Sequence, residues 1–170
     1  MTIESAGVPV VAFVGRSGSG KTTLLAQVIS ELARLGVRVA AIKHAPGHDI
    51  VTDVEGSDSY RFWASGASSV VLVGRDRVVE TRRHAEEPEV EALIADLVDV
   101  HLVLLEGYKQ SHYDKIEVVR AACDPRLIPG LERRVALVTD VGLPEADYAV
   151  FGFHEVLRLV EFLRKRYLSQ

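Results

Sequence analysis

The sequence predicts an α/β fold with a mainly parallel sheet flanked by helices and with a β-hairpin addition. Three observations support this prediction. A glycine-rich loop follows an apolar run near the N-terminus, strand-like apolar runs alternate with amphipathic helical runs, and one polar tetrapeptide separates two β-rich segments. The 170 residues suit one domain, so we expect a single domain over 1–170, with 1–7 as a loose leader.

The most specific of these features is the glycine-rich loop. Residues 8–14 form a continuous apolar run, as expected of a buried strand, and residues 15–22 spell G-R-S-G-S-G-K-T. An amphipathic run over 24–35 follows, and Gly36 is placed to end a helix there. Strand, phosphate loop and helix in this order define the P-loop pattern of nucleotide-binding domains. A chance match in a glycine-containing turn is the alternative, which the flanking strand and helix disfavour.

Each part of the loop has a chemical role in binding a nucleotide. Glycines let successive backbone N–H groups turn toward phosphates, and a helix that opens at Lys21 adds its positive dipole end. We expect Lys21 to contact the β- and γ-phosphates and assist catalysis, and the Thr22 hydroxyl to bind Mg²⁺. The residues expected to bind the nucleotide here are Gly15, Arg16, Ser17, Gly18, Ser19, Gly20, Lys21, Thr22 and Thr23.

Composition excludes several other classes of protein. A net charge of −4 is not the footprint of a nucleic-acid binder. No apolar run approaches the ~20 residues that span a bilayer, and the N-terminus has no secretion-signal pattern. A single cysteine, Cys123, excludes an internal disulfide framework. We therefore expect a cytoplasmic protein with neither a nucleic-acid nor a membrane partner.

The rest of the chain continues the alternation of strands and helices. Further strands are expected over 37–43, 102–105, 115–119 (short and alternating), 135–138 and 148–151, and further helices over 57–66, 88–98 and 155–167. The segments 69–73 and 78–81 flank Gly74-Arg75-Asp76-Arg77 and predict a hairpin, interpreted as an added edge element of the sheet. Such edges often pair with a second subunit.

A P-loop site also needs an acid to help hold Mg²⁺, usually at the end of a separate buried strand. Glu106 follows the apolar run 102–105 and fits this role. The alternative is a plain strand-end carboxylate exposed to solvent.

Several short motifs then follow one another in an order that resembles a known family. They are the loop at 15–24, Lys43-His44, Gly56-Ser57-Asp58-Ser59 with Ala64-Ser65-Gly66-Ala67, Glu106-Gly107-Tyr108-Lys109, Lys115-Ile116-Glu117-Val118-Val119-Arg120 and Val138-Thr139-Asp140. Together they resemble the molybdopterin-guanine dinucleotide biosynthesis protein B (MobB) family, over residues 8 to about 140. Two positions depart from that pattern: His101 replaces an acid, and Pro46-Gly47-His48 replaces a run of histidines.

The resemblance implies a GTP-binding, weakly hydrolysing protein that forms homodimers. It implies an adaptor role in molybdenum-cofactor maturation, assisting the guanylyltransferase that attaches GMP to molybdenum-loaded molybdopterin. Direct contact with molybdopterin is left open. Separately, Asp140 ends a buried strand late in the chain, where many GTP-binding P-loop proteins place the acid that recognises guanine, although the usual N-K-x-D string is absent. A carboxylate there can accept hydrogen bonds from both N1–H and the exocyclic amino group. A strand-end turn is the alternative for Asp140.

Other residues keep alternative interpretations. Asp53 is predicted to order Mg²⁺ or the attacking water from a switch-like loop, and a solvated loop or a metal site with His44, His48 and Asp49 are the alternatives. Arg16 is either a finger that reaches a partner's phosphates or a solvent-facing arginine. For the whole chain, a small-molecule or nucleotide kinase is the second hypothesis, and a partition-type or metallochaperone-type ATPase is the third.

Overall fold

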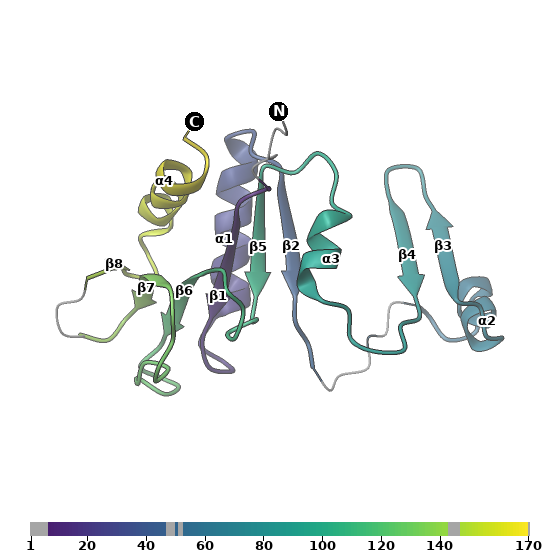
Figure 1. Ribbon diagram of the computed structural model, residues 1–170, viewed down its shortest axis with the longest axis horizontal. Helices are drawn as coiled ribbons and strands as arrows, with labels where there is room; N and C mark the ends of the chain where they lie inside the picture. The colour runs from purple at the N-terminus through teal and green to yellow at the C-terminus, as the bar shows by residue number, and fades with distance from the viewer. Residues whose placement is uncertain (1–6, 47–49, 51–52, 143–146, 170) are drawn as a thin grey trace, which may run out of the picture. The chain divides into compact units, whose positions relative to one another are not determined.

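The computed structural model describes residues 7–46, 50, 53–142 and 147–169. The chain forms two compact units, one made of Met1–Ala45 with Leu97–Gln170 and the other of Pro46–Asp96. Each unit has its own sheet (Figure 1). The single domain over 1–170 stays a prediction.

The first unit is built on a six-stranded sheet in which every neighbouring pair of strands is parallel. The strand order is β2-β5-β1-β6-β7-β8. The bounds are Val10–Val14 for β1, Val39–Lys43 for β2, Leu102–Glu106 for β5, Asp114–Val119 for β6, Arg134–Thr139 for β7 and Ala149–Phe151 for β8. The predicted α/β fold with a mainly parallel sheet is therefore confirmed.

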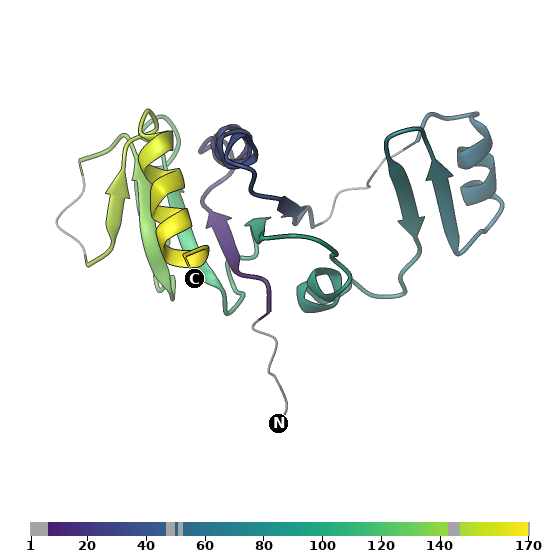
Figure 2. The ribbon, with the colours of Figure 1, turned by 90° about the horizontal axis from the view of Figure 1, so that it is seen from above.

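Two amphipathic helices, α1 (Lys21–Arg34) and α4 (Val156–Tyr167), complete the core of this unit. They contact each other, as Figure 2 shows, and bury the apolar stripes that the sequence predicts. Leu32 of α1 and Leu163 of α4 are fully buried with Phe13 of β1 in one cluster. No helix among the described residues is long and apolar enough to cross a membrane.

Strand β6 differs from the alternating pattern expected of it. Lys115 and Glu117 are buried along with their apolar neighbours, so both faces of the strand are covered. Their polar groups have partners: Lys115 Nζ donates to the carbonyl of Ser111 at 2.6 Å, and Glu117 accepts from Arg134 Nε at 2.7 Å. Pairing allows these charged residues to be buried. The alternation of charged and apolar residues therefore predicts an exposed face that the strand does not have.

The second unit contains α2 (Asp58–Ala64), β3 (Ser69–Val73), β4 (Val78–Arg82) and α3 (Val90–Ala95). The predicted hairpin is confirmed, with Val73 opposite Val78 in an antiparallel pair. Its interpretation as an edge of the parallel sheet is wrong, because β3 and β4 form a two-stranded sheet of their own. Helix α3 is shorter than expected and ends at Ala95, since only Val90 is fully buried along it.

The carboxyl ends of parallel strands meet at one edge of a sheet, the lower edge in Figure 1. The chain places 15–20 directly after β1, Glu106 at the end of β5, Arg120 after β6, Asp140 after β7 and Phe153 after β8. The fold therefore gathers a loop, two acids, an arginine and an aromatic ring along the edge where α/β proteins bind ligands.

Candidate nucleotide-binding site

The chain between β1 and α1 forms the phosphate loop. Gly18 and Gly20 have φ angles of +76° and +88°, in the left-handed region that favours glycine. A Cβ atom at Gly15 would lie 2.4 Å from the carbonyl oxygen of Val118 in β6, so a side chain does not fit where the loop leaves β1. All three glycines of the motif therefore have a steric reason to be glycine.

The loop leads into α1 with unsatisfied polar groups. Gly20 is the N-cap of α1, and no side chain caps the helix there, so the first backbone N–H groups remain available to an anion. The Ser19 hydroxyl is buried and has no hydrogen-bond partner within the described part of the chain. Buried polar groups normally have a partner, so both features fit a loop that is completed by phosphate oxygens.

Lys21 folds back over this loop. Its Nζ donates to the carbonyl of Gly15 at 3.1 Å and to that of Arg16 at 2.8 Å. Burial lowers the pKa of Lys21, and the nearby Glu106 carboxylate opposes that effect. An ammonium held beside the loop amides is placed to contact a bound phosphate as a point charge.

Thr22 and Glu106 meet at the start of α1 and the end of β5. The Thr22 hydroxyl lies 2.9 and 3.0 Å from the two carboxylate oxygens of Glu106. The Lys43 ammonium, at the end of the adjacent β2, lies 3.4 Å from the same carboxylate. The Glu106 side chain is only 12% exposed, so these contacts occupy a sheltered position.

This pair of oxygen donors fits the chemistry of Mg²⁺. Magnesium prefers oxygen ligands and is usually held by few protein groups together with substrate phosphates and water. No group of three or more His, Cys, Asp and Glu side chains that could hold a metal ion by themselves occurs among the residues that the structure describes. Thr22 and Glu106 could hold Mg²⁺ only together with ligands supplied by a nucleotide and water, and their role as metal ligands stays a prediction.

Asp140 lies farther along the same edge, after β7. Its Oδ1 accepts a hydrogen bond from the Ala121 backbone N–H at 2.7 Å, and its Oδ2 lies 3.9 Å from Arg120 Nε. The side chain is 44% exposed, so lone pairs of the carboxylate remain open to solvent or a ligand. This position is compatible with the predicted recognition of a base.

Arg16 is paired within its own chain. Its Nε lies 2.7 Å from an oxygen of Asp124, which also binds the guanidinium of Arg126. Hydrogen bonds from Arg126, with a smaller electrostatic contribution from Arg16, lower the pKa of Asp124 to about 2. To act as a finger, Arg16 would have to leave this ionised partner, and that role stays a prediction.

Asp53 belongs to the second unit and contacts the start of α2. Its Oδ1 accepts from the Ser57 hydroxyl and the Val54 N–H, both at 2.9 Å, and hydrogen bonds from Ser59 and Ser57 lower its pKa. In the described residues the aspartate therefore supports a helix N-terminus, and its catalytic role stays a prediction. Of the alternative metal ligands, His48 and Asp49 lie outside the described residues, and His44 stacks on Tyr108 with ring centroids 4.8 Å apart.

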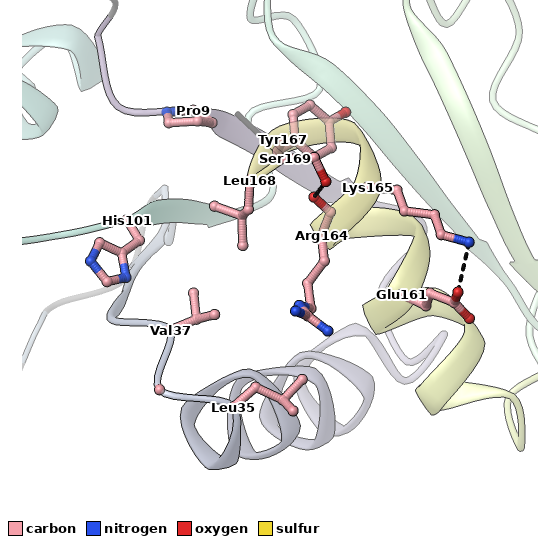
Figure 3. Close-up of a pocket in the computed structure, with 11 residues that line it drawn as sticks. Pro9, Leu35, Val37, His101, Glu161, Arg164, Lys165, Tyr167, Leu168 and Ser169 are labelled. Atoms are coloured by element: carbon pink, nitrogen blue, oxygen red, sulfur yellow. Dashed lines mark hydrogen bonds and ion pairs between the residues drawn. The ribbon is translucent and has the colours of Figure 1, made fainter.

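A separate cavity of about 730 Å³ lies at the opposite, amino edge of the first unit (Figure 3). Val37 before β2, His101 before β5 and Arg164 of α4 are among its lining residues. His101, which departs from the family pattern, accepts a hydrogen bond through Nδ1 from the Arg38 N–H at 3.2 Å. It thus joins the starts of two neighbouring strands and has no place in the nucleotide site.

Sequence reasoning missed Lys43, Arg120 and Phe153 as members of this edge. Each follows or ends a strand; Lys43 and Arg120 lie in motifs that carry the family resemblance, but those motifs do not assign either residue a role in the site. The strand order β2-β5-β1-β6-β7-β8 brings them beside the loop. Their positions at or just after the ends of strands were the one indication in the sequence that they lie at this edge.

The phosphate loop lies between β1 and α1, and an acid, Glu106, ends the neighbouring strand β5. This arrangement on a parallel sheet defines a P-loop NTPase fold. The sequence model of the family described as "Molybdopterin guanine dinucleotide synthesis protein B" matches residues 10–140. The chain belongs to this family, MobB, and the resemblance seen in its motifs is confirmed.

Relatives and solved structures agree with this assignment. The molybdopterin-guanine dinucleotide biosynthesis adapter proteins of Haemophilus influenzae and Escherichia coli are each 32% identical to this chain; the matches span 92% of it, and 88% and 91% of the relatives respectively. A crystal structure of a MobB homolog from Bacillus stearothermophilus superposes with a TM-score of 0.72 at 25% identity, over 95% of this chain and 99% of that one. Another, of molybdopterin-guanine biosynthesis protein B, gives 0.75 at 28% identity, over 92% and 99%.

Proposed function

We propose that this protein binds GTP and Mg²⁺ through its phosphate loop and acts as an adapter in the formation of molybdopterin guanine dinucleotide, assisting the guanylyltransferase of that step. Membership of the MobB family supports the pathway. The contact between Thr22 and Glu106 beside the loop is the observation that best supports Mg²⁺-dependent nucleotide binding. A cytoplasmic location without nucleic-acid or membrane partners remains part of the proposal.

The proposed activity on the bound nucleotide is slow hydrolysis. Loop amides and Lys21 would hold the phosphates, and Thr22 with Glu106 would hold Mg²⁺, which when bound would supply positive charge to neutralise the phosphates. Water attacks the γ-phosphorus, the bond to the β–γ bridging oxygen breaks, and GDP, inorganic phosphate and a proton are released. Asp53 is the proposed group that orders the water, and Asp140 is the proposed group that recognises guanine.

A competition titration tests nucleotide binding. A fluorescent guanine nucleotide bound with Mg²⁺ is displaced by GTP, ATP or XTP from the wild-type protein, from Lys21→Ala and from Lys165→Ala. Lys165 is a matched control, because it is a surface lysine of α4 paired with Glu161. We expect GTP to displace at least tenfold better than ATP, about 1.4 kcal/mol, and only Lys21→Ala to abolish binding.

The contrary outcomes are separable. Equal competition by ATP would refute guanine selection and leave the phosphate loop intact. Retained binding by Lys21→Ala would refute the loop as the site. Transfer of the γ-phosphate to an added acceptor, and not to water, would favour the kinase alternative.

The adapter role needs a second experiment with the purified guanylyltransferase of the same organism. We expect the two proteins to associate in the presence of GTP and Mg²⁺, and the guanylyltransferase to form more product when this protein is added. Lys21→Ala should lose the nucleotide-dependent part of the association. Product formation that is unchanged by the wild-type protein at saturating concentration would refute the adapter role.

We also propose that the chain forms a homodimer through the hairpin of the second unit. Val71, Val73 and Val78 on the hairpin are 52%, 79% and 63% exposed, an apolar surface of the kind that marks interfaces. Sedimentation should show a dimer that Val73→Asp shifts toward monomer. Val98→Asp, at an 84% exposed valine outside the hairpin, should leave the dimer intact. A dimer unaffected by Val73→Asp would place the interface elsewhere.

A further inference from the structure

Arg120 has an unusual position directly after β6. Its Cζ lies 4.1 Å from the centroid of the Phe153 ring. On the other side, a Cβ atom built on Gly20 would lie 3.5 Å from the same Cζ and 3.7 Å from both terminal nitrogens. The guanidinium therefore stacks on an aromatic ring and lies near the last glycine of the phosphate loop, beside the candidate nucleotide site.

Within the described part of the chain, this guanidinium makes no hydrogen bond. Arg120 Nε is buried and makes no hydrogen bond within the described chain, with the nearest Asp140 oxygen 3.9 Å away. Its terminal nitrogens donate no hydrogen bond to the described residues either, and the side chain is 39% exposed. A fixed arginine with free donors beside an acid is more consistent with a binding group than with a structural ion pair, which would normally close to hydrogen-bond distance.

Asp140 is oriented at the same place by a different contact. The Ala121 N–H, one residue after Arg120, donates to its Oδ1 at 2.7 Å. This bond holds the carboxylate beside the guanidinium and leaves other lone pairs available. The two side chains therefore present a donor surface and an acceptor surface next to each other.

We propose that Arg120, supported by Phe153, recognises the O6 and N7 acceptors of guanine, while Asp140 accepts from N1–H and the exocyclic amino group. This inference rests on the proposed binding of GTP and assigns the base specificity of that site. Arginine is the side chain that most often pairs with O6 and N7 of guanine. Adenine has an amino donor at position 6, which would face the donors of Arg120. Its N1 is an acceptor, which would face the carboxylate of Asp140.

The experiment measures Mg²⁺-dependent binding of GTP, 7-deaza-GTP, ATP and inorganic tripolyphosphate to wild type, Arg120→Gln and Arg126→Gln. Arg126 is a matched control, because it lies in the same segment and its guanidinium binds Asp124. We expect 7-deaza-GTP, which lacks N7, to bind the wild type about tenfold more weakly than GTP, as for loss of one hydrogen bond to a charged group. Arg120→Gln should bind GTP and 7-deaza-GTP equally, lose most of the preference for GTP over ATP, and bind tripolyphosphate like the wild type.

Each other result has a definite meaning. Equal binding of GTP and 7-deaza-GTP to the wild type would overturn the inference without any variant, so a folding defect in Arg120→Gln cannot obscure it. Equal weakening of all four ligands by Arg120→Gln would overturn it too, and would assign the arginine to the phosphates. Failure of every ligand to bind the wild type would overturn the proposed GTP binding, and the inference with it.

Discussion

The Thr22 hydroxyl lies within 3.0 Å of both carboxylate oxygens of Glu106, although 84 positions separate the residues in sequence. The parallel pairing of β1 with β5, with Phe13 opposite Glu106, produces this contact. The helix after β1 then starts where β5 ends. The two proposed Mg²⁺ ligands are therefore positioned by backbone pairing, and a change at either should affect the metal specifically.

The first prediction is that Glu106→Gln lowers the affinity of the nucleotide-bound protein for Mg²⁺. The amide keeps the shape of the side chain and removes its charge, so we expect the apparent Mg²⁺ affinity to fall about 10–100-fold. Binding of the nucleotide without metal should not weaken. A titration of Mg²⁺ at fixed nucleotide concentration measures this.

Glu161→Gln is the control for this experiment, because Glu161 pairs with Lys165 on the surface of α4. It should leave the Mg²⁺ titration unchanged. If Glu106→Gln behaves like this control, Glu106 is only a partner for Lys43 and Thr22, and the proposed metal site is wrong.

The second prediction separates catalysis from helix capping at Asp53. Asp53→Ala should lower Mg²⁺-dependent GTP hydrolysis at least about tenfold if the carboxylate orders the attacking water. The Ser57 hydroxyl accepts a hydrogen bond from the Tyr60 N–H at 3.2 Å as the N-cap of α2, and it also donates to Asp53. Ser57→Ala should therefore cost about 1 kcal/mol of stability and leave the hydrolysis rate nearly unchanged.

Measured rates of GTP hydrolysis and thermal unfolding of both variants decide the matter. Equal loss of hydrolysis in Asp53→Ala and Ser57→Ala would mean that the loss follows from a loosened α2. Unchanged hydrolysis in Asp53→Ala would remove the residue from the reaction altogether.

Most of the fold could be predicted from the sequence because several of its strands contain short continuous apolar runs. Residues 102–105 are all fully buried, and such a run has few other interpretations. Strand β6 was harder, because Lys115 and Glu117 resemble the outward side of an alternating strand. Only their partners in neighbouring segments show why they are inside.

The site could be predicted where one local motif encodes it and not where the strand order assembles it. The phosphate loop is contiguous, so its residues were identified together. The contacts of Lys43 with Glu106 and of Arg120 with Phe153 depend on which strands are neighbours. Periodicity identifies strands but does not state their order, so these contacts lay beyond sequence reasoning.

The third prediction concerns the acid titration of Asp124. Its hydrogen bonds with Arg126, and to a lesser degree the charge of Arg16, lower its pKa from 3.8 to about 2. A lowered carboxyl pKa stabilises the fold above the unfolded value and loses that contribution as the pH falls through the folded value. The contribution should thus be complete above about pH 4 and decline toward about pH 2.

Nuclear magnetic resonance of the aspartate carboxyl carbons measures this pKa directly. Arg126→Ala should return the Asp124 pKa most of the way to its ordinary value, because the hydrogen bonds from Arg126 are the largest cause. Arg16→Ala should raise it less. The reverse order would show that Arg16 is the stronger partner, which would weigh against its release as a finger.

The last prediction concerns the buried pair of Glu117 in β6 and Arg134 in β7. Glu117 is fully buried; it accepts from Arg134 Nε at 2.7 Å and from the Ile128 N–H at 2.6 Å. Arg134→Met leaves a buried carboxylate without its cation, so we expect a loss of about 3–5 kcal/mol in the free energy of unfolding. Chemical denaturation followed by circular dichroism measures it.

Two further variants make the cause of that loss identifiable. Arg133→Met removes the neighbouring arginine, which is 58% exposed and pairs with Asp114, and should cost less than about 1 kcal/mol. Glu117→Gln combined with Arg134→Met removes both charges, and the Gln oxygen can still accept from the Ile128 N–H. The double variant should therefore recover most of the stability lost by Arg134→Met. If it is as unstable as Arg134→Met alone, the loss comes from the packing of the arginine side chain or from its hydrogen bond to the Ile128 carbonyl, and not from an unpaired charge.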